Sequence, residues 1–115
     1  MLVDEHERRV SMNETLFRDV NERVRELEEG FGSPGGPLYF VCECGDAQCT
    51  ERMMLTKEEY EAVRSQGNRF AVVRGHEIPA VEVVVDQTDR FLVVEKHPGG
   101  PSRLAEERDP RAASR

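Results

Sequence analysis

Long apolar runs and an excess of basic residues are both missing from this chain of 115 residues. No stretch approaches the roughly eighteen apolar residues of a membrane-spanning helix, and the first residues lack the basic segment and apolar run of a secretion signal. The formal charge of −7 at pH 7 opposes sequence-independent attraction to a phosphate backbone. We therefore expect a cytoplasmic protein without a membrane anchor, and nucleic acid is not an expected partner.

The short motifs that mark common enzyme classes are also absent. The sequence contains no H-E-x-x-H, no G-x-S-x-G and no glycine loop that could cradle a phosphate. Because no reaction signature is complete, the sequence favours a binding or regulatory role over catalysis.

Cysteine is scarce, and its three copies all lie within the stretch "FVCECGDAQC". In a reducing cytoplasm an odd number of clustered cysteines argues against a disulfide framework and for a metal site or reactive thiols. A flat strand would hold Cys42 and Cys44 about 7 Å apart, which is too wide for two ligands of one tetrahedral zinc ion. The chain must therefore bend after Cys42. Gly45 can supply the bend by adopting left-handed backbone angles, and the turn "GDAQ" can then return Cys49 to the same point.

A zinc ion held by three thiolates needs a fourth donor, and the chain contains three histidines. His6 lies in a charged N-terminal stretch far from the cysteines in sequence, and His97 ends the last expected strand. His76 follows a strand and a glycine in "VVRGHEIP", in the kind of loop that can hold a side chain over the end of a sheet. We choose His76 as the fourth donor, with His97 as the alternative. The predicted ligands of a structural Zn²⁺ are Cys42, Cys44, Cys49 and His76.

Two other interpretations use the same residues. Cys42, Cys44 and Cys49 could form a thiol-based redox sensor in which Cys49 acts as the resolving thiol. A zinc hydrolase would need an open position on the metal and a general base, and Glu77 beside His76 could fill that role. A cysteine-rich shell is more often closed and structural, so we expect a small metal-binding protein that acts as a protein-interaction or regulatory module.

Apolar residues recur at helical spacing near the N-terminus. The positions are Val10, Phe17, Val24 and Phe31 at intervals of seven, with Val20 and Leu27 between them. The pattern predicts an amphipathic helix within residues 1–29, which ends where Gly30 supplies a stop. Because the pattern covers only about three heptads, two alternatives stay open. The stripe packs on the chain's own sheet, or it pairs with a second copy or another protein partner.

Two copies of "PGGP" bracket the middle of the chain. We interpret residues 30–37 as a glycine and proline linker, residues 38–97 as the folded unit and residues 98–115 as a disordered tail. Within the unit, "LYFVC", "RFAVV", "VEVVV" and "RFLVVE" predict strands, the last two form a hairpin, and Thr56 caps a short helix. The expected class is α+β, an N-terminal helix followed by a small antiparallel sheet of roughly three or four strands and one short helix. A unit of about sixty residues is marginal on apolar burial alone and often relies on a metal or on association.

Four segments carry a resemblance to a known family. They are "NETLFRDVNERVRELEE", "FVCECGDAQCTERMMLTKEEYEAVR", "RFAVVRGHEIPAVEVVV" and "RFLVVEK". With its FVCECG, LTxEEY, GHE and VVEK elements, the chain resembles a family of small uncharacterised bacterial proteins of the actinobacterial type over most of its length. The resemblance implies a bacterial cytosolic origin and no particular activity, so the metal assignment depends on ligand chemistry alone.

Overall fold

Helices and two small antiparallel sheets build the protein, so the predicted α+β class is confirmed. The computed structural model describes residues 5–31 and 36–114. In chain order the elements are α1 (Glu5–Phe31), β1 (Leu38–Val41), β2 (Arg52–Leu55), α2 (Lys57–Val63), β3 (Arg69–Val72), β4 (Glu82–Gln87), β5 (Leu92–Lys96), α3 (Gly100–Glu107) and a 3₁₀ helix (Ala112–Ser114). None of the helices in the described part of the chain combines the length and apolar composition needed to cross a membrane.

The strands form two sheets where one was expected. β1 pairs with β2, and β5 lies between β3 and β4, with every pair antiparallel. The predicted hairpin is formed by β4 and β5, and a bulge interrupts it between Val84 and Asp86. The strand that sequence analysis missed is β2, whose residues "RMML" include no β-branched or aromatic side chain. Pairing with β1, rather than intrinsic propensity, therefore makes this segment a strand.

The boundaries of the two predicted helices differ from the expected ones by a few residues. α1 continues through Gly30 to Phe31, and residues 32–35 of the predicted linker lie outside the described part of the chain, as does the side chain of Phe31. The cap of α2 is as predicted, because the Thr56 hydroxyl accepts the Glu59 N–H at 3.1 Å and the Glu59 carboxylate accepts the Thr56 N–H at 2.8 Å. α2 then ends at Val63, before the expected stop.

An apolar cluster lies on each face of the three-stranded sheet. Under α2 and the β1–β2 hairpin lie Phe40, Met53, Leu55, Tyr60, Val63, Ala71, Phe91 and Val93. On the other face lie Cys42, Cys44, Phe70, Val72, Leu92, Val94 and Ala105. Successive residues of β3 and β5 enter opposite clusters, as the two-residue period of a strand requires. Two of the three cysteines are therefore part of a core and lie on the face of the sheet next to α3.

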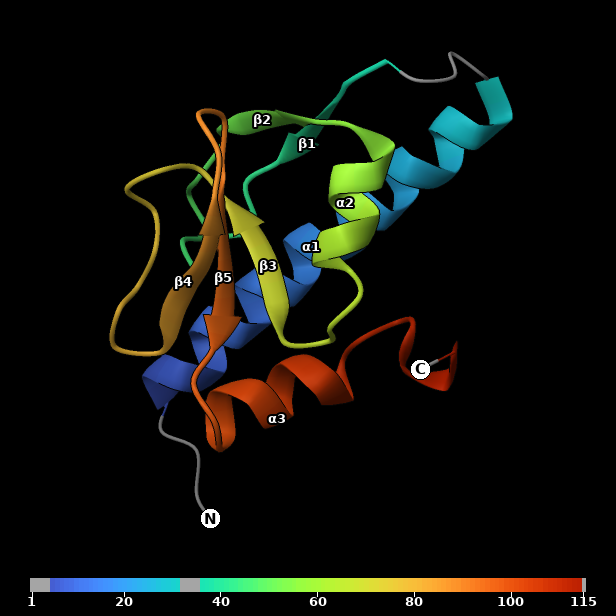
Figure 1. Cartoon of the computed structure of the whole chain (residues 1–115). Coiled ribbons are helices and arrows are strands. Elements are labelled where there is room, and N and C mark those ends of the chain that lie inside the picture. The colour runs from blue at the N-terminus through green and yellow to red at the C-terminus, as the bar shows by residue number, and fades with distance from the viewer. Residues whose placement is uncertain (1–4, 32–35, 115) are drawn as a thin grey trace.

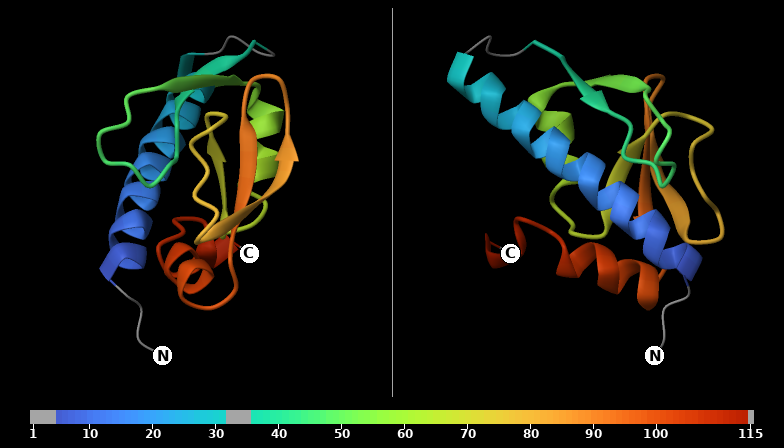
Figure 2. Two further views of the ribbon diagram at one scale, coloured as in Figure 1. Left: turned by 90° about the vertical axis from the view of Figure 1, so that its left-hand side faces the viewer. Right: turned by 180° about the vertical axis from the view of Figure 1, so that it is seen from behind.

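α1 crosses one side of the molecule from end to end. The ribbon seen from behind shows it in front of the sheets, with α3 beside its N-terminal half (Figure 2). The opposite view places α2 and the three-stranded sheet on the near side (Figure 1). Residues of α1 contact both α3 and β1, so the N-terminal helix is part of the folded body.

The face of α1 that meets the rest of the protein is largely polar. Its buried residues are Val10, Ser11, Glu14, Thr15, Arg18 and Asn21. The Arg18 guanidinium donates to the carbonyl oxygens of Gly67 at 2.8 Å and Ala105 at 2.9 Å. It also lies 4.8 Å from the centre of the Phe70 ring, in cation–π contact. Directional hydrogen bonds therefore fix the helix on the body.

The predicted apolar stripe of α1 is divided between two surroundings. Val10 is buried, Phe17 and Val24 are partly buried, and Val20 and Leu27 are exposed. Packing against the chain's own body therefore accounts for only part of the stripe.

Residues 98–115 were expected to form a disordered tail, and this prediction is wrong for the described residues up to 114. α3 buries Leu104 and Ala105. Farther along, the carboxylate of Asp109 accepts a hydrogen bond from the guanidinium of Arg64, and both residues are buried. The small apolar area of this segment does not predict its order, because hydrogen bonds to the buried Arg18 and Arg64 also hold it.

A buried ion cluster joins α1 to the three-stranded sheet. The Nζ of Lys96 lies 2.7 Å from Oε2 of Glu14 and 2.9 Å from Oε1 of Glu82, and all three side chains are buried. Burial raises the pKa of Glu14 from its ordinary value near 4.5 to about 8, with Lys96 opposing the rise and Glu82 adding to it. One lysine faces two carboxylates, which favours the neutral form of Glu14.

Glu14 should make the stability of the protein fall with rising pH. Because its pKa is higher in the folded protein than in the unfolded chain, its stabilisation is complete below about pH 4.5 and is lost as the pH rises toward about 8. Between about pH 6 and pH 8 the unfolding free energy of wild type should fall by about 2 kcal/mol more than that of Glu14→Gln. Urea unfolding of both proteins at the two pH values measures this difference. Glu26→Gln, which changes an exposed residue of the same helix, should lose as much unfolding free energy as wild type does. An equal loss in Glu14→Gln and wild type would contradict a raised pKa of Glu14.

Candidate metal centre

The three cysteines lie where the chain leaves β1 and turns. The backbone N–H of Cys42, one residue beyond the strand, donates to the Glu51 carbonyl at 3.0 Å. The carbonyl of Asp46 accepts the Cys49 N–H at 3.0 Å and closes the turn that returns the third cysteine. The bend expected after Cys42 is therefore present.

Gly45 is needed in this turn for a different reason than expected. The glycines with positive φ in the described part of the chain are Gly75 and Gly99. A Cβ on Gly45 would instead lie 2.6 Å from Cγ1 of Val10 and 3.0 Å from Cδ1 of Ile78. The Gly45 carbonyl also accepts a hydrogen bond from the Asn13 amide at 2.8 Å. Glycine therefore allows the cysteine turn to approach α1 closely.

Four side chains converge beside this turn at the spacing of a tetrahedral metal site. One ligand atom from each of Cys42, Cys44, Cys49 and His76 lies within 4.8 Å of all the others. Nδ1 of His76 is 3.6 Å from Sγ of Cys42 and 3.5 Å from Sγ of Cys49. A tetrahedral zinc ion with bonds of about 2.3 Å to sulfur and about 2.05 Å to nitrogen would separate such atoms by about 3.6 Å. The four residues could therefore hold a metal ion with little movement.

His76 reaches the cysteines from the loop between β3 and β4. Gly75 turns this loop with φ of 94°, and the His76 N–H donates to the Val73 carbonyl at 2.9 Å. The second ring nitrogen, Nε2, lies 2.7 Å from Oε2 of Glu51. A proton on Nε2 that is donated to Glu51 leaves the lone pair of Nδ1 directed at the thiols. Sequence reasoning missed Glu51, which is marked only by its place two residues after Cys49.

Each thiol also receives a backbone N–H. Val73 donates to Sγ of Cys42 at 3.2 Å, Asp46 donates to Cys44, and Glu51 donates to Cys49. Amide donors stabilise the thiolate form that a metal requires.

The thiols affect one another strongly. A hydrogen bond from Cys42 and the Asp46 N–H lower the pKa of Cys44 to about 5. The same hydrogen bond is the larger cause that raises the pKa of Cys42, and burial is the smaller one. Burial also raises the pKa of Cys49. The hydrogen bond to Cys44 and the nearby Glu51 raise the pKa of His76. One negative charge is thus readily held here, whereas further thiolates need a cation to offset their repulsion.

Glu43, between the first two cysteines, points away from the site and connects it to two other elements. Its Oε1 accepts the Ala71 N–H of β3 at 2.9 Å, and its Oε2 accepts the Asn21 amide of α1 at 2.8 Å. The Glu43 N–H also donates to the Ala71 carbonyl at 2.9 Å. These hydrogen bonds fix the backbone at Glu43, and with it the positions of Cys42 and Cys44 on either side.

The remaining candidates are not part of the cluster. His6 is exposed on the first turn of α1, and His97 follows β5, where its backbone N–H donates to the Val81 carbonyl at 2.8 Å. The Glu77 carboxylate accepts the Gly75 N–H at 2.9 Å. Of the three histidines, the structure brings only His76 to the cysteines.

Comparisons with known proteins add no further assignment. No protein-family model, no curated protein and no solved structure matches the chain. The site is therefore interpreted from its own geometry and ligand chemistry.

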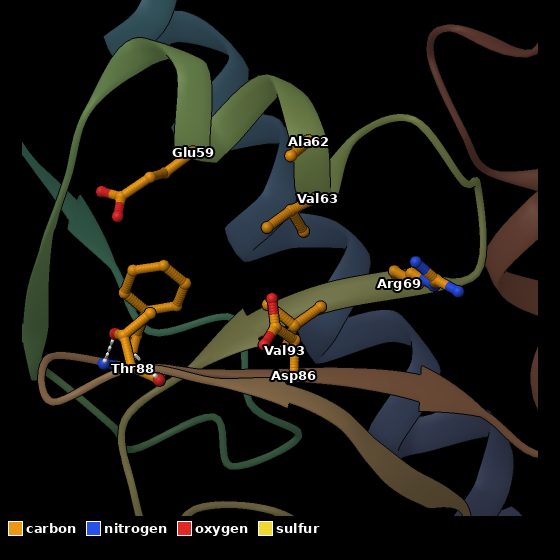
Figure 3. A pocket seen from close by; sticks show the side chains of 8 residues that line it. Glu59, Ala62, Val63, Arg69, Asp86, Thr88 and Val93 are labelled. Atoms are coloured by element: carbon orange, nitrogen blue, oxygen red, sulfur yellow. Dashed lines mark hydrogen bonds between the residues drawn. The ribbon is translucent and has the colours of Figure 1, made fainter.

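A hollow of about 190 Å³ lies between α2 and the β4–β5 hairpin, away from the cysteines. Figure 3 shows side chains of α2 facing those of the hairpin across it. Its lining residues are Glu59, Ala62, Val63, Arg69, Asp86, Thr88, Phe91 and Val93. Two of its charged groups are already paired, Glu59 with Arg90 and Arg69 with Glu95. The hollow therefore presents no cluster of free reactive groups.

Replacing the imidazole should impair metal retention selectively. His76→Ala removes one of four ligands and should weaken the affinity for Zn²⁺ by more than about a hundredfold. His97→Ala is the matched control and should leave the affinity unchanged, because the contact that His97 makes to Val81 is through its backbone. Competition with a chelating indicator measures both proteins. Equal Zn²⁺ affinity in both variants, or a weaker affinity only in His97→Ala, would show that His76 is not the fourth ligand.

Glu51 should act on the metal through His76. Glu51→Gln removes the charge that orients the ring, and the Zn²⁺ affinity should fall by about tenfold, the low end for such contacts because the Glu51 side chain is 57% exposed. Glu77→Gln, which changes a carboxylate bonded to Gly75, serves as the control and should keep wild-type affinity. The same competition assay applies. Affinity losses of equal size in the two variants would contradict a specific role for Glu51.

Proposed function

We propose that the protein is a small zinc-binding module in which a structural Zn²⁺ is held by Cys42, Cys44, Cys49 and His76. The observation that carries this proposal is the distance from Nδ1 of His76 to two thiol sulfurs, 3.5 and 3.6 Å. Those values match the edge of a zinc tetrahedron, and three thiolates with one imidazole complete its ligand set. A complete protein ligand set favours a structural role, because a catalytic zinc keeps one position for water or substrate.

The location of the site supports a structural role. A metal there joins the turn after β1 to the loop between β3 and β4, and these segments are about thirty residues apart in sequence. Cys42 and Cys44 belong to the apolar cluster shared with α3. Small domains with limited cores commonly gain stability from such a metal, because the ion constrains the folded state and not the unfolded chain.

The cellular setting we infer is the bacterial cytoplasm. The resemblance to small bacterial proteins supports this inference. The cysteines are free thiols rather than disulfides, and a reducing compartment maintains thiolate ligands for a metal.

Within that setting, we assign the module to protein interaction through α1. Part of the predicted apolar stripe stays exposed although the helix is firmly docked. The hydrolase alternative has less support, because Glu77 is bonded to the backbone of its own loop. The redox alternative uses the same thiols, and a measurement of metal content distinguishes it from the zinc-binding module.

Metal analysis of protein purified without added metal tests the proposal. We expect about one equivalent of zinc and no thiol that reacts with Ellman's reagent until the metal is removed. Removal by a chelator should lower the melting temperature by about 10 °C or more. Less than about a tenth of an equivalent of zinc or iron, together with three freely reacting thiols, would refute the metal assignment and favour the redox alternative.

A further inference from the structure

The outward face of α1 carries an apolar stripe that the described part of the chain leaves exposed. Its members are Met12, Leu16, Val20 and Leu27, which are 53%, 60%, 40% and 60% exposed. Intervals of four, four and seven residues place them along one line of the helix. The view from behind shows α1 crossing the near surface of the molecule (Figure 2).

The helix is thus inverted relative to an ordinary surface helix. A surface helix places its apolar stripe against the core and its charges outside. α1 instead buries Glu14, Arg18 and Asn21 and exposes Leu16 and Leu27. A contiguous row of exposed apolar side chains, rather than a single one, marks a candidate site of contact with another molecule.

The charges within the stripe distinguish between two ways of pairing α1 with itself. Asp19 and Arg23 lie on the same outward face, both exposed, and neither forms an ion pair with another described residue. In a parallel pair each of them would face its own copy, which places like charges opposite each other. In an antiparallel pair centred near Val20, Asp19 of each copy lies beside Arg23 of the other.

The same antiparallel arrangement matches the apolar residues. With the two-fold axis near Val20, this residue meets its own copy. Met12 and Leu16 then lie near Leu27 of the second chain, at both ends of the contact.

We propose that the outward face of α1 binds a second copy of this chain, as an antiparallel two-fold helix pair centred near Val20. The proposal rests on the assignment of α1 as the interaction surface. It names a second copy as the occupant, because the Asp19 and Arg23 charges complement the same charges on a reversed copy.

Sedimentation equilibrium of the full metal-loaded chain tests this pairing. Wild type should sediment with twice the mass of the chain at about 200 µM and dissociate on dilution. Leu16→Glu should weaken association by at least about tenfold, because it buries a charge at the contact. Val83→Glu is the control at an exposed apolar residue of β4 and should associate as wild type does.

A charge exchange tests the direction of the helices. Asp19→Arg and Arg23→Glu should each weaken association by about threefold to tenfold, and the double variant should recover it, because the charge pairs are restored with reversed sign. If the two single variants weaken association and the double variant does not recover it, the antiparallel arrangement is refuted. A wild-type monomer at every concentration, including one that binds lipid vesicles or another protein instead, would refute the proposal itself. Metal content measured on the same samples shows separately whether the zinc assignment holds.

Discussion

The buried carboxylate of Glu43 is the contact on which the arrangement of α1, the sheet and the cysteines depends. Burial raises its pKa, and hydrogen bonds from Asn21 and the Ala71 N–H oppose that rise. A buried carboxyl group is tolerated only when its hydrogen bonds are satisfied, so both donors must stay in place. Because Glu43 lies between Cys42 and Cys44, its inward direction leaves the two thiols on the side where His76 lies. The position of α1 and the geometry of the candidate metal centre are thus determined together.

The polar contacts of α1 stabilise the fold less than apolar packing would, but they fix the position of the helix along the body. Burying Arg18 costs desolvation, which its two carbonyl acceptors and the Phe70 ring only partly offset. An apolar stripe in the same place could slide by a turn with little penalty, whereas hydrogen bonds to particular carbonyls, such as those of Gly67 and Ala105, permit one register. The register also sets the outward face, so the inner contacts determine which residues a partner meets.

The parts of this structure that sequence could predict are those with a local signal. The capping box of α2, the turn that gathers the three cysteines and the β4–β5 hairpin each follow from residues close to the feature they define. His76 is about thirty residues from the cysteines, and its convergence on them was predicted from ligand chemistry, because three thiolates need a fourth donor. β2 and α3 could not be predicted in this way, because pairing with β1 and hydrogen bonding to buried arginines hold them in place. The periodicity of α1 correctly indicated a helix. It left the covered face open, since an apolar stripe does not reveal whether the molecule's own core or another chain covers it, and the structure buries Val10 while it exposes Val20 and Leu27.

The candidate metal centre and the outward face of α1 are linked through the cysteine turn. Val10 packs against Gly45, Asn13 bonds to its carbonyl, and Glu43 holds Asn21, so three residues of α1 contact the segment that carries the thiols. A ligand that binds only the folded arrangement stabilises everything that belongs to that arrangement. In the proposed assembly, Zn²⁺ at the cysteines would therefore favour the position of α1 that pairs with a second chain, and pairing would in turn favour retention of the metal.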